Sequence, residues 1–283
     1  MREQTLNCLG PHGFHRLHYY EWGEPANDKV VICVHGLTRN GRDFDDLARA
    51  LSANYRVLCP DVVGRGRSAW LADKQDYGYP LYCSDLAMLI ARSGASQVNW
   101  IGTSMGGLIG MLLAAQPGSP IRKLVINDVG PFIPKASLDR IAAYVGKDPR
   151  YESFEEFEQY IRVVSQPFGP LTDSQWRQLA QTNVRQHADG RWGPIYDPAI
   201  GLPFQAVQND VLLWPYWDQV RCSALLLRGR ESDLLLEATA QEMTRRGPRA
   251  RLVEFPGIGH APMLMAQDQI EVIRDFLMGD PVR

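Results

Sequence analysis

Short apolar runs alternate with longer amphipathic stretches along most of this chain. Continuous runs of aliphatic and β-branched residues are typical of strands buried on both faces, whereas apolar residues recurring every three to four positions indicate helices. The expected strands are 16–22, 30–34, 56–59, 97–101, 123–126, 224–227 and 251–255. The expected helices are 43–53, 81–91, 107–115, 236–246 and 267–277. This alternation predicts an α/β fold with a mainly parallel central sheet flanked by helices.

One long segment between 126 and 224 interrupts the alternation. Its roughly 95 residues exceed an ordinary connection and contain no clear buried strand. Helical patterns occur instead at 154–161 and 173–179. We therefore expect a helical cap, inserted after the strand at 123–126 and lying over the sheet.

The domain boundaries follow from this segment. We expect the core domain to comprise 1–130 and 220–283, and the cap to comprise 131–219. Most of the tryptophans fall in the cap, at Trp176, Trp192, Trp214 and Trp217. Two interpretations of the aromatic residues of the cap stay open: they form the core of the cap, or they form a lipophilic wall that faces Ser104.

Composition and charge narrow the range of partners. The chain has 283 residues, of which 45% are hydrophobic, enough for one large α/β domain with an insertion. A formal net charge of -2 gives no electrostatic reason to expect nucleic acid or an anionic membrane as a partner. The five cysteines form no C-x-x-C pair, and neither a signal peptide nor a stretch long enough to span a membrane is evident. We expect a cytoplasmic protein, and the sequence leaves its oligomeric state open.

The strongest chemical signal is Gly102-Thr103-Ser104-Met105-Gly106, which lies between an expected strand and an expected helix. Gly-x-Ser-x-Gly in this context is a nucleophile elbow, a sharp turn that presents the serine. Side chains at Gly102 and Gly106 would crowd the neighbouring backbone. The pattern alone arises by chance about 0.1 times in a chain of this length, so the remaining sequence must support it.

Further polar residues follow the other expected strands. Ligands of open parallel sheets bind at the carboxyl ends of the strands, so these positions are candidates for chemistry. In chain order they supply a serine, an acid and a histidine. The segments are His35-Gly36-Leu37, Asp61 to Ser68, Ser104, Asn127-Asp128, Gly229 to Asp233 and Gly259-His260.

These motifs make the chain similar to the α/β-hydrolases over nearly its whole length. The matching motifs are His35-Gly36, Asp61-x-x-Gly64-x-Gly66-x-Ser68, Gly102-x-Ser104-x-Gly106 and Gly259-His260. The resemblance implies that Ser104 is the nucleophile, His260 the general base and then acid, and Asp233 the acid that orients His260. It also implies that the backbone N–H groups of Leu37 and Met105 form the oxyanion hole.

The identity of the acid is the open part of this assignment. Asp233 comes fourth after the strand-end glycine, Gly229, whereas the family's usual spacing is three, so Glu231 stays an alternative. Asp128, one strand earlier, is a second alternative because some relatives take their acid from there. We favour Asp233.

Other polar residues are more consistent with structural roles. We expect His35 and Asp61 to organise loops. His12, His15 and His18 have the spacing of a metal site, but positions three apart alternate between the faces of a strand. We therefore expect neither a metal nor a cofactor.

A serine nucleophile indicates acyl chemistry. Histidine, with an ordinary pKa near 6.5, can take the serine proton at neutral pH and return it to the leaving group. We predict a carboxylic ester hydrolase that forms an acyl-serine intermediate on small to medium apolar esters, and on polyesters if the cap leaves an open cleft.

Alternative functions remain. A C–C bond hydrolase or an enol-lactonase of aromatic degradation is one, although such C–C hydrolases usually carry tryptophan directly after the histidine, where this chain has Ala261. A small-molecule receptor with slow turnover is an alternative of another class.

Overall fold

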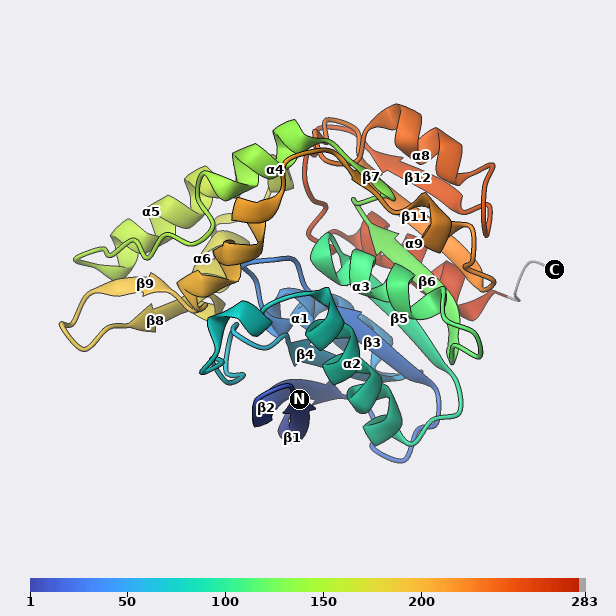
Figure 1. The fold of residues 1–283 in the computed structure, drawn as a ribbon, viewed down its shortest axis with the longest axis horizontal. Coiled ribbons are helices and arrows are strands. Elements are labelled where there is room, and N and C mark those ends of the chain that lie inside the picture. Colours follow the sequence, from blue (N-terminus) through green and yellow to red (C-terminus); the bar gives the residue numbers. More distant parts are fainter. Residues whose placement is uncertain (280–283) are drawn as a thin grey trace.

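An eight-stranded sheet runs through the centre of the computed structural model, which describes residues 1–279 (Figure 1). β2 is antiparallel to both of its neighbours, and the other neighbouring strands are parallel. The predicted mainly parallel α/β sheet is thereby confirmed. From one edge to the other the strands are β1 (Arg2–Gly10), β2 (Gly13–Trp22), β4 (Arg56–Asp61), β3 (Val30–Val34), β5 (Val98–Thr103), β6 (Ile121–Asn127), β11 (Ser223–Gly229) and β12 (Arg251–Phe255).

Alternate residues of the central strands build two hydrophobic layers, one on each face. In β3, Val30, Ile32 and Val34 pack into one layer, while Val31 and Cys33 pack into the other. Each fully buried aliphatic side chain contributes about 1.5–3 kcal/mol. The first layer is covered by α2 (Tyr79–Ser93), α3 (Met105–Ala114) and α8 (Glu237–Met243), and the second by α1 (Asp45–Leu51) and α9 (Gln267–Met278). Three-residue to four-residue 3₁₀ turns, η1 (Gly41–Phe44) and η2 (Lys74–Asp76), precede α1 and α2.

The edge strand β1 was not predicted, and β2 begins earlier than expected. The two strands form a hairpin in which Cys8 pairs with His15. Only Cys8 is fully buried in β1, and the other positions are exposed or half-buried. An edge strand with one buried side chain lacks the apolar run by which the central strands are recognised.

The chain between β6 and β11 forms a series of short elements (Figure 1). Its short strands pair only with one another, β7 with β10 and β8 with β9, so none extends the central sheet. The elements are β7 (Phe132–Ile133), α4 (Lys135–Ala142), α5 (Phe154–Val164), η3 (Gln166–Phe168), α6 (Asp173–Thr182), β8 (Val184–Gln186), β9 (Trp192–Pro194), η4 (Pro198–Ala206), β10 (Val211–Leu212) and α7 (Trp214–Trp217).

The two longest helices of this segment carry N-terminal caps that their sequences encode. The Ser153 hydroxyl accepts from the backbone N–H of Glu156 at the start of α5. Thr172 and Gln175 form a capping box at the start of α6. Such caps satisfy N–H groups that have no partner within the helix and contribute about 1 kcal/mol each.

The four tryptophans of the segment pack into hydrophobic clusters. Trp176 and Trp192 pack with residues of α5 and α6. Trp214 and Trp217 pack against the main core, and the Trp217 indole N–H donates to the carbonyl oxygen of Arg246 at 3.1 Å. Trp176 and Trp192 thus pack within the segment, as the first interpretation expects, whereas Trp214 and Trp217 belong to the core of the sheet, which neither interpretation expects.

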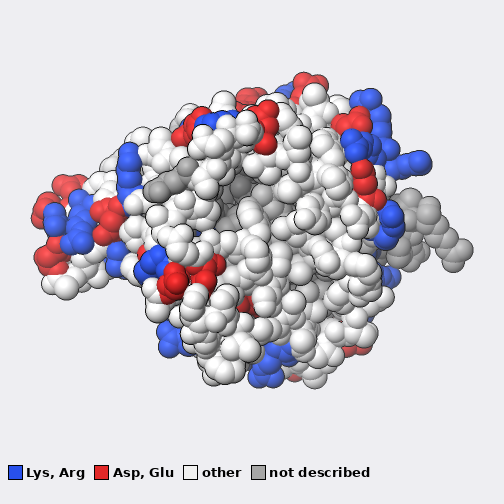
Figure 2. Space-filling model, in the orientation of Figure 1, with Lys and Arg blue, Asp and Glu red and all other residues white. Residues whose placement is uncertain are grey.

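Charged side chains in the view of Figure 2 lie mainly around the periphery, including the far end of the segment that carries β8 and β9. Both signs are mixed there: Arg150 and Arg191 each pair with Asp189 at 2.8 Å. Charge at this end is balanced locally. None of the described helices has the length and apolar character needed to cross a membrane.

Candidate active site

Ser104 lies at the sharp turn that joins β5 to α3. Its backbone has φ 51° and ψ -115°, a strained conformation for a residue with a side chain. A Cβ atom on Gly102 would lie 2.2 Å from the backbone of Gly106, and one on Gly106 would lie 2.0 Å from the carbonyl oxygen of Val34. The expectation that side chains at both glycines would crowd the backbone is confirmed.

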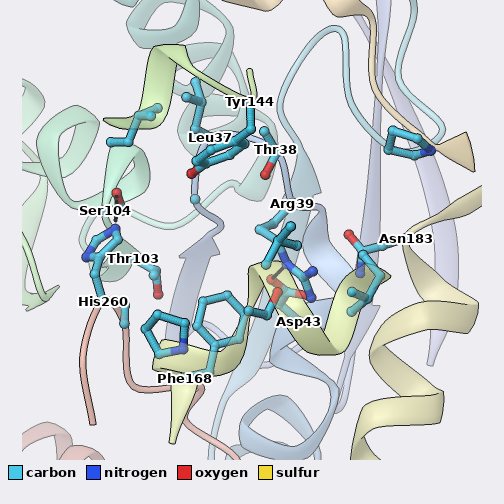
Figure 3. Close-up of a pocket in the computed structure, with 18 of the residues that line it drawn as sticks. Leu37, Thr38, Arg39, Asp43, Thr103, Ser104, Tyr144, Phe168, Asn183 and His260 are labelled. Carbon is cyan, nitrogen blue, oxygen red and sulfur yellow. Dashed lines mark hydrogen bonds and ion pairs between the residues drawn. The ribbon is translucent and has the colours of Figure 1, made fainter. Parts of the chain in front are cut away.

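A continuous hydrogen-bond relay leads from Ser104 to a buried carboxylate. The Ser104 hydroxyl lies 2.9 Å from Nε2 of His260 (Figure 3). Nδ1 of His260 lies 2.8 Å from Oδ2 of Asp128. A carboxylate can only accept, so Nδ1 carries the proton and Nε2 is free to accept from the serine hydroxyl. The imidazole is thus held in the tautomer that can deprotonate the serine.

Asp128 is the residue that contacts His260, and the expectation that Asp233 would do so is wrong. The Asp128 carboxylate is fully buried. It accepts from the backbone N–H of Gly229 at 2.8 Å and from the Ser232 hydroxyl at 2.6 Å, in addition to His260. Burial of an ionised carboxylate is costly unless hydrogen bonds compensate for the lost water, and these three donors do so.

Asp233 and Glu231 lie elsewhere. Asp233 is 56% exposed and pairs with Arg140, with a shortest distance of 2.6 Å. Glu231 accepts from the backbone N–H of Ile258 at 2.9 Å and so holds the loop that leads to His260. Both alternatives follow β11, but neither carboxylate contacts the imidazole.

The predicted oxyanion-hole residues adjoin Ser104. Leu37 lies in the loop after β3 and lines the same hollow as Ser104 (Figure 3). Met105 is the first residue of α3. The first N–H groups of a helix have no partner within the helix. The backbone N–H of Met105 is therefore available for an external acceptor.

Arg65 is a residue of this region that sequence reasoning missed. Its fully buried guanidinium donates from Nε to the carbonyl oxygen of Leu37 at 2.8 Å. Nη2 contacts the sulfur of Met105 at 3.6 Å. Arg65 thus contacts both residues that are predicted to form the oxyanion hole. An arginine between two turn glycines carries no sequence pattern that would reveal this role.

His35 and Asp61 organise loops, as expected. Burial lowers the pKa of His35 to about 4, so its imidazole is neutral. Nε2 accepts from the backbone N–H of Val62 at 2.9 Å, and Nδ1 lies 2.6 Å from the carbonyl oxygen of Gly36. The Asp61 carboxylate accepts from the backbone N–H groups of Gly41 and Arg67, both at 2.8 Å.

A hollow beside Ser104 is lined from both parts of the chain (Figure 3). Four aromatic side chains of the segment after β6 contribute to its wall, and none of the tryptophans is among the lining residues. Burial raises the pKa of Tyr144 and raises that of Tyr160 to about 12, so both phenols are neutral. The aromatic lining residues are Tyr144, Tyr160, Phe168 and Tyr196.

Metal-ligating side chains do not gather at this hollow. Within residues 1–279, one group could hold a cation, Cys8, His15 and Asp85, and none of the three lines the hollow. The three histidines of the hairpin contact different carboxylates: His12 contacts Asp76, His15 contacts Asp85, and His18 contacts both Asp61 and Glu3.

Comparisons with known proteins identify the family of the chain. The model of the alpha/beta hydrolase family matches residues 31–272. The 3-hydroxybutyrate-oligomer hydrolase of Cupriavidus necator is 46% identical, with 97% of each chain covered.

Two solved structures are similar over nearly their whole length. A putative hydrolase from Rickettsia typhi superimposes with a TM-score of 0.92 at 32% identity, covering 98% of this chain and 99% of that one. An alpha/beta hydrolase from Novosphingobium aromaticivorans superimposes with a TM-score of 0.87 at 36% identity, covering 98% of this chain and 97% of that one.

Proposed function

Since the chain belongs to the alpha/beta hydrolase family and is a carboxylic ester hydrolase, we propose that Ser104, His260 and Asp128 form its catalytic triad. The observation that carries this proposal is the relay in which His260 lies 2.9 Å from the Ser104 hydroxyl and 2.8 Å from Asp128. We further propose that the substrates are short oligoesters of hydroxy acids, because a relative of 46% identity is a 3-hydroxybutyrate-oligomer hydrolase.

The reaction follows from the protons and acceptors of the relay. Ser104 attacks the ester carbonyl while His260 takes the hydroxyl proton, and Asp128 stabilises the resulting imidazolium. The tetrahedral intermediate places its oxyanion against the N–H groups of Leu37 and Met105, each worth about 3–4 kcal/mol in the transition state. His260 protonates the departing alcohol, which leaves an acyl-serine. Water then attacks the acyl-serine with His260 as base, releasing the acid and restoring the serine hydroxyl.

The segment 131–219 is the proposed cap of this site, with 1–130 and 220–283 as the core domain. Support comes from the hollow, which is lined by Ser104 and His260 of the core together with Tyr160 and Phe168 of the segment. An aromatic wall suits the apolar chain of an ester. All five cysteines are free, which supports our proposal that the enzyme acts in the cytoplasm.

Ser104→Ala tests the triad. We expect kcat/KM for nitrophenyl butyrate and for 3-hydroxybutyrate oligomers to fall by at least about 10⁴-fold, because no nucleophile remains to form the acyl intermediate. Ser165→Ala is the matched control. It removes another hydroxyl that lines the hollow. We expect its loss of kcat/KM to be far smaller than that of Ser104→Ala.

Two results would contradict the proposal. If Ser104→Ala retained the wild-type rate, Ser104 would not be the nucleophile. Stoichiometric labelling of Ser104 by an organophosphate, together with almost no ester turnover, would indicate a receptor instead of an enzyme.

A further inference from the structure

One wall of the hollow is formed by a charged side chain that the triad does not use. Arg39 follows the oxyanion loop and lines the hollow together with Ser104 (Figure 3). Its side chain is only 11% exposed. Asp43 accepts from Nε and from Nη2 of Arg39, both at 2.7 Å. This two-point contact fixes the plane of the guanidinium.

The fixed guanidinium keeps a free edge. A guanidinium has five N–H donors, and Asp43 occupies one on Nε and one on Nη2. Among the described residues, no other group accepts a hydrogen bond from Arg39. Nη1 therefore has no partner there, and since it is not one of the buried unpaired atoms it is accessible. The Phe168 ring lies 5.7 Å from the guanidinium carbon and limits its exposure to water. Arg39 is therefore a preoriented cation with unused donors.

We propose that Arg39 forms a carboxylate-binding subsite that receives the free acid end of a hydroxy-acid oligoester. The proposal rests on the ester hydrolase function and names the substrate group that this part of the site recognises. The planar fork of arginine matches a carboxylate, and an arginine already held in place loses little conformational entropy when it binds. Asp43 is the only carboxylate among the described residues lining the hollow, whereas Arg39 and Arg140 both line it.

The subsite lies close to the nucleophile. A Cβ atom built on Gly36 would lie 3.7 Å from Cβ of Ser104 and 3.9 Å from Cγ of Arg39. The stem of Arg39 is thus separated from the nucleophile by little more than one small residue. The proposed subsite and the nucleophile therefore belong to the same hollow, and an oligoester whose acid end binds Arg39 would present one of its ester bonds to Ser104.

The test compares two substrates that differ only in this charge: a 3-hydroxybutyrate dimer with a free acid end, and the same dimer as its primary amide. We expect the wild-type enzyme to favour the acid. Arg39→Gln should lower the acid-to-amide ratio of kcat/KM by about 10- to 100-fold, mainly through KM, because a charge-assisted contact is lost. Arg39→Lys keeps the charge without the fork and should give an intermediate ratio.

Arg140→Gln is the matched control, since it removes the other arginine of the hollow. Arg140 is 43% exposed and pairs with Asp233, so its field is screened and the ratio should change less. Equal ratios for wild type and Arg39→Gln would overturn the subsite while leaving the ester hydrolase function intact. If Arg39→Gln fails to fold, a wild-type enzyme without preference for the acid would overturn it equally. Failure of the wild-type enzyme on both dimers and on nitrophenyl butyrate would overturn the proposed function itself.

Discussion

The loops that follow β6 and β11 each carry an aspartate, but the two carboxylates lie in opposite environments. Asp128, after β6, is fully buried and accepts from His260, Gly229 and Ser232. Asp233, after β11, is 56% exposed and pairs with Arg140. The same residue type at the ends of neighbouring strands therefore forms a buried relay in one case and a surface ion pair in the other.

The difference shows that the chain after β6 and the chain at the end of β11 have different roles in the relay. β6 and β11 are parallel neighbours in which Asn127 pairs with Leu227, so Asp128 lies beside the residues just beyond that pair. The end of β11 and the loop after it contribute two donors to the Asp128 carboxylate, the N–H of Gly229 and the hydroxyl of Ser232. The loop after β6 thus supplies the charged carboxylate, and the β11 side supplies hydrogen-bond donors that take the place of water around it.

Of the substitutions that test this comparison, Asp128→Asn should lower kcat the most. An amide cannot stabilise the imidazolium, and it can donate to Nδ1 and so favour the wrong tautomer of His260. We expect kcat for nitrophenyl butyrate to fall by about 10³- to 10⁴-fold, with thermal unfolding recorded as a control for folding. A decrease below tenfold would show that Asp128 is not the acid of the triad.

The sequence identified the serine and the histidine of the relay better than its acid. The Gly-x-Ser-x-Gly pattern and the terminal Gly259-His260 place Ser104 and His260, because each has a local geometric requirement. The order of serine, acid and histidine is satisfied by Asp128 and by Asp233 alike. Burial and neighbouring donors decide between the two, and these are set by the pairing of β6 with β11 rather than by local sequence.

The same physical reason separates the predicted from the unpredicted parts of the fold. The central strand β3 is buried at all five positions, and its apolar run is visible in the sequence. In the edge strand β1 only Cys8 is fully buried, so no such run exists. Contacts between distant segments, such as those of Arg65 with Leu37 and Met105, leave no local pattern.

Ser232→Ala should have an intermediate effect. It removes one of the three donors to Asp128 but leaves the carboxylate and the Gly229 N–H in place. We expect kcat to fall by about tenfold with KM nearly unchanged, since a hydrogen bond to a charged group is worth about 1.5–3 kcal/mol and water can replace part of it. Ser232→Thr, which keeps the hydroxyl, is the matched control. Equal losses in both variants would indicate a packing effect.

Asp233→Asn should have the smallest effect and provides the direct counterpart to Asp128→Asn. An exposed ion pair contributes about 0–1 kcal/mol, and the carbonyl oxygen of Asp233 that accepts from the Ser137 hydroxyl is kept in the variant. We expect kcat/KM on a neutral nitrophenyl ester to stay within about twofold of the wild type. A neutral ester is required because Arg140, once unpaired, would attract an anionic substrate and obscure the comparison. A loss on the neutral ester that approaches the loss of Asp128→Asn would indicate that Asp233, and not Asp128, is the acid of the triad.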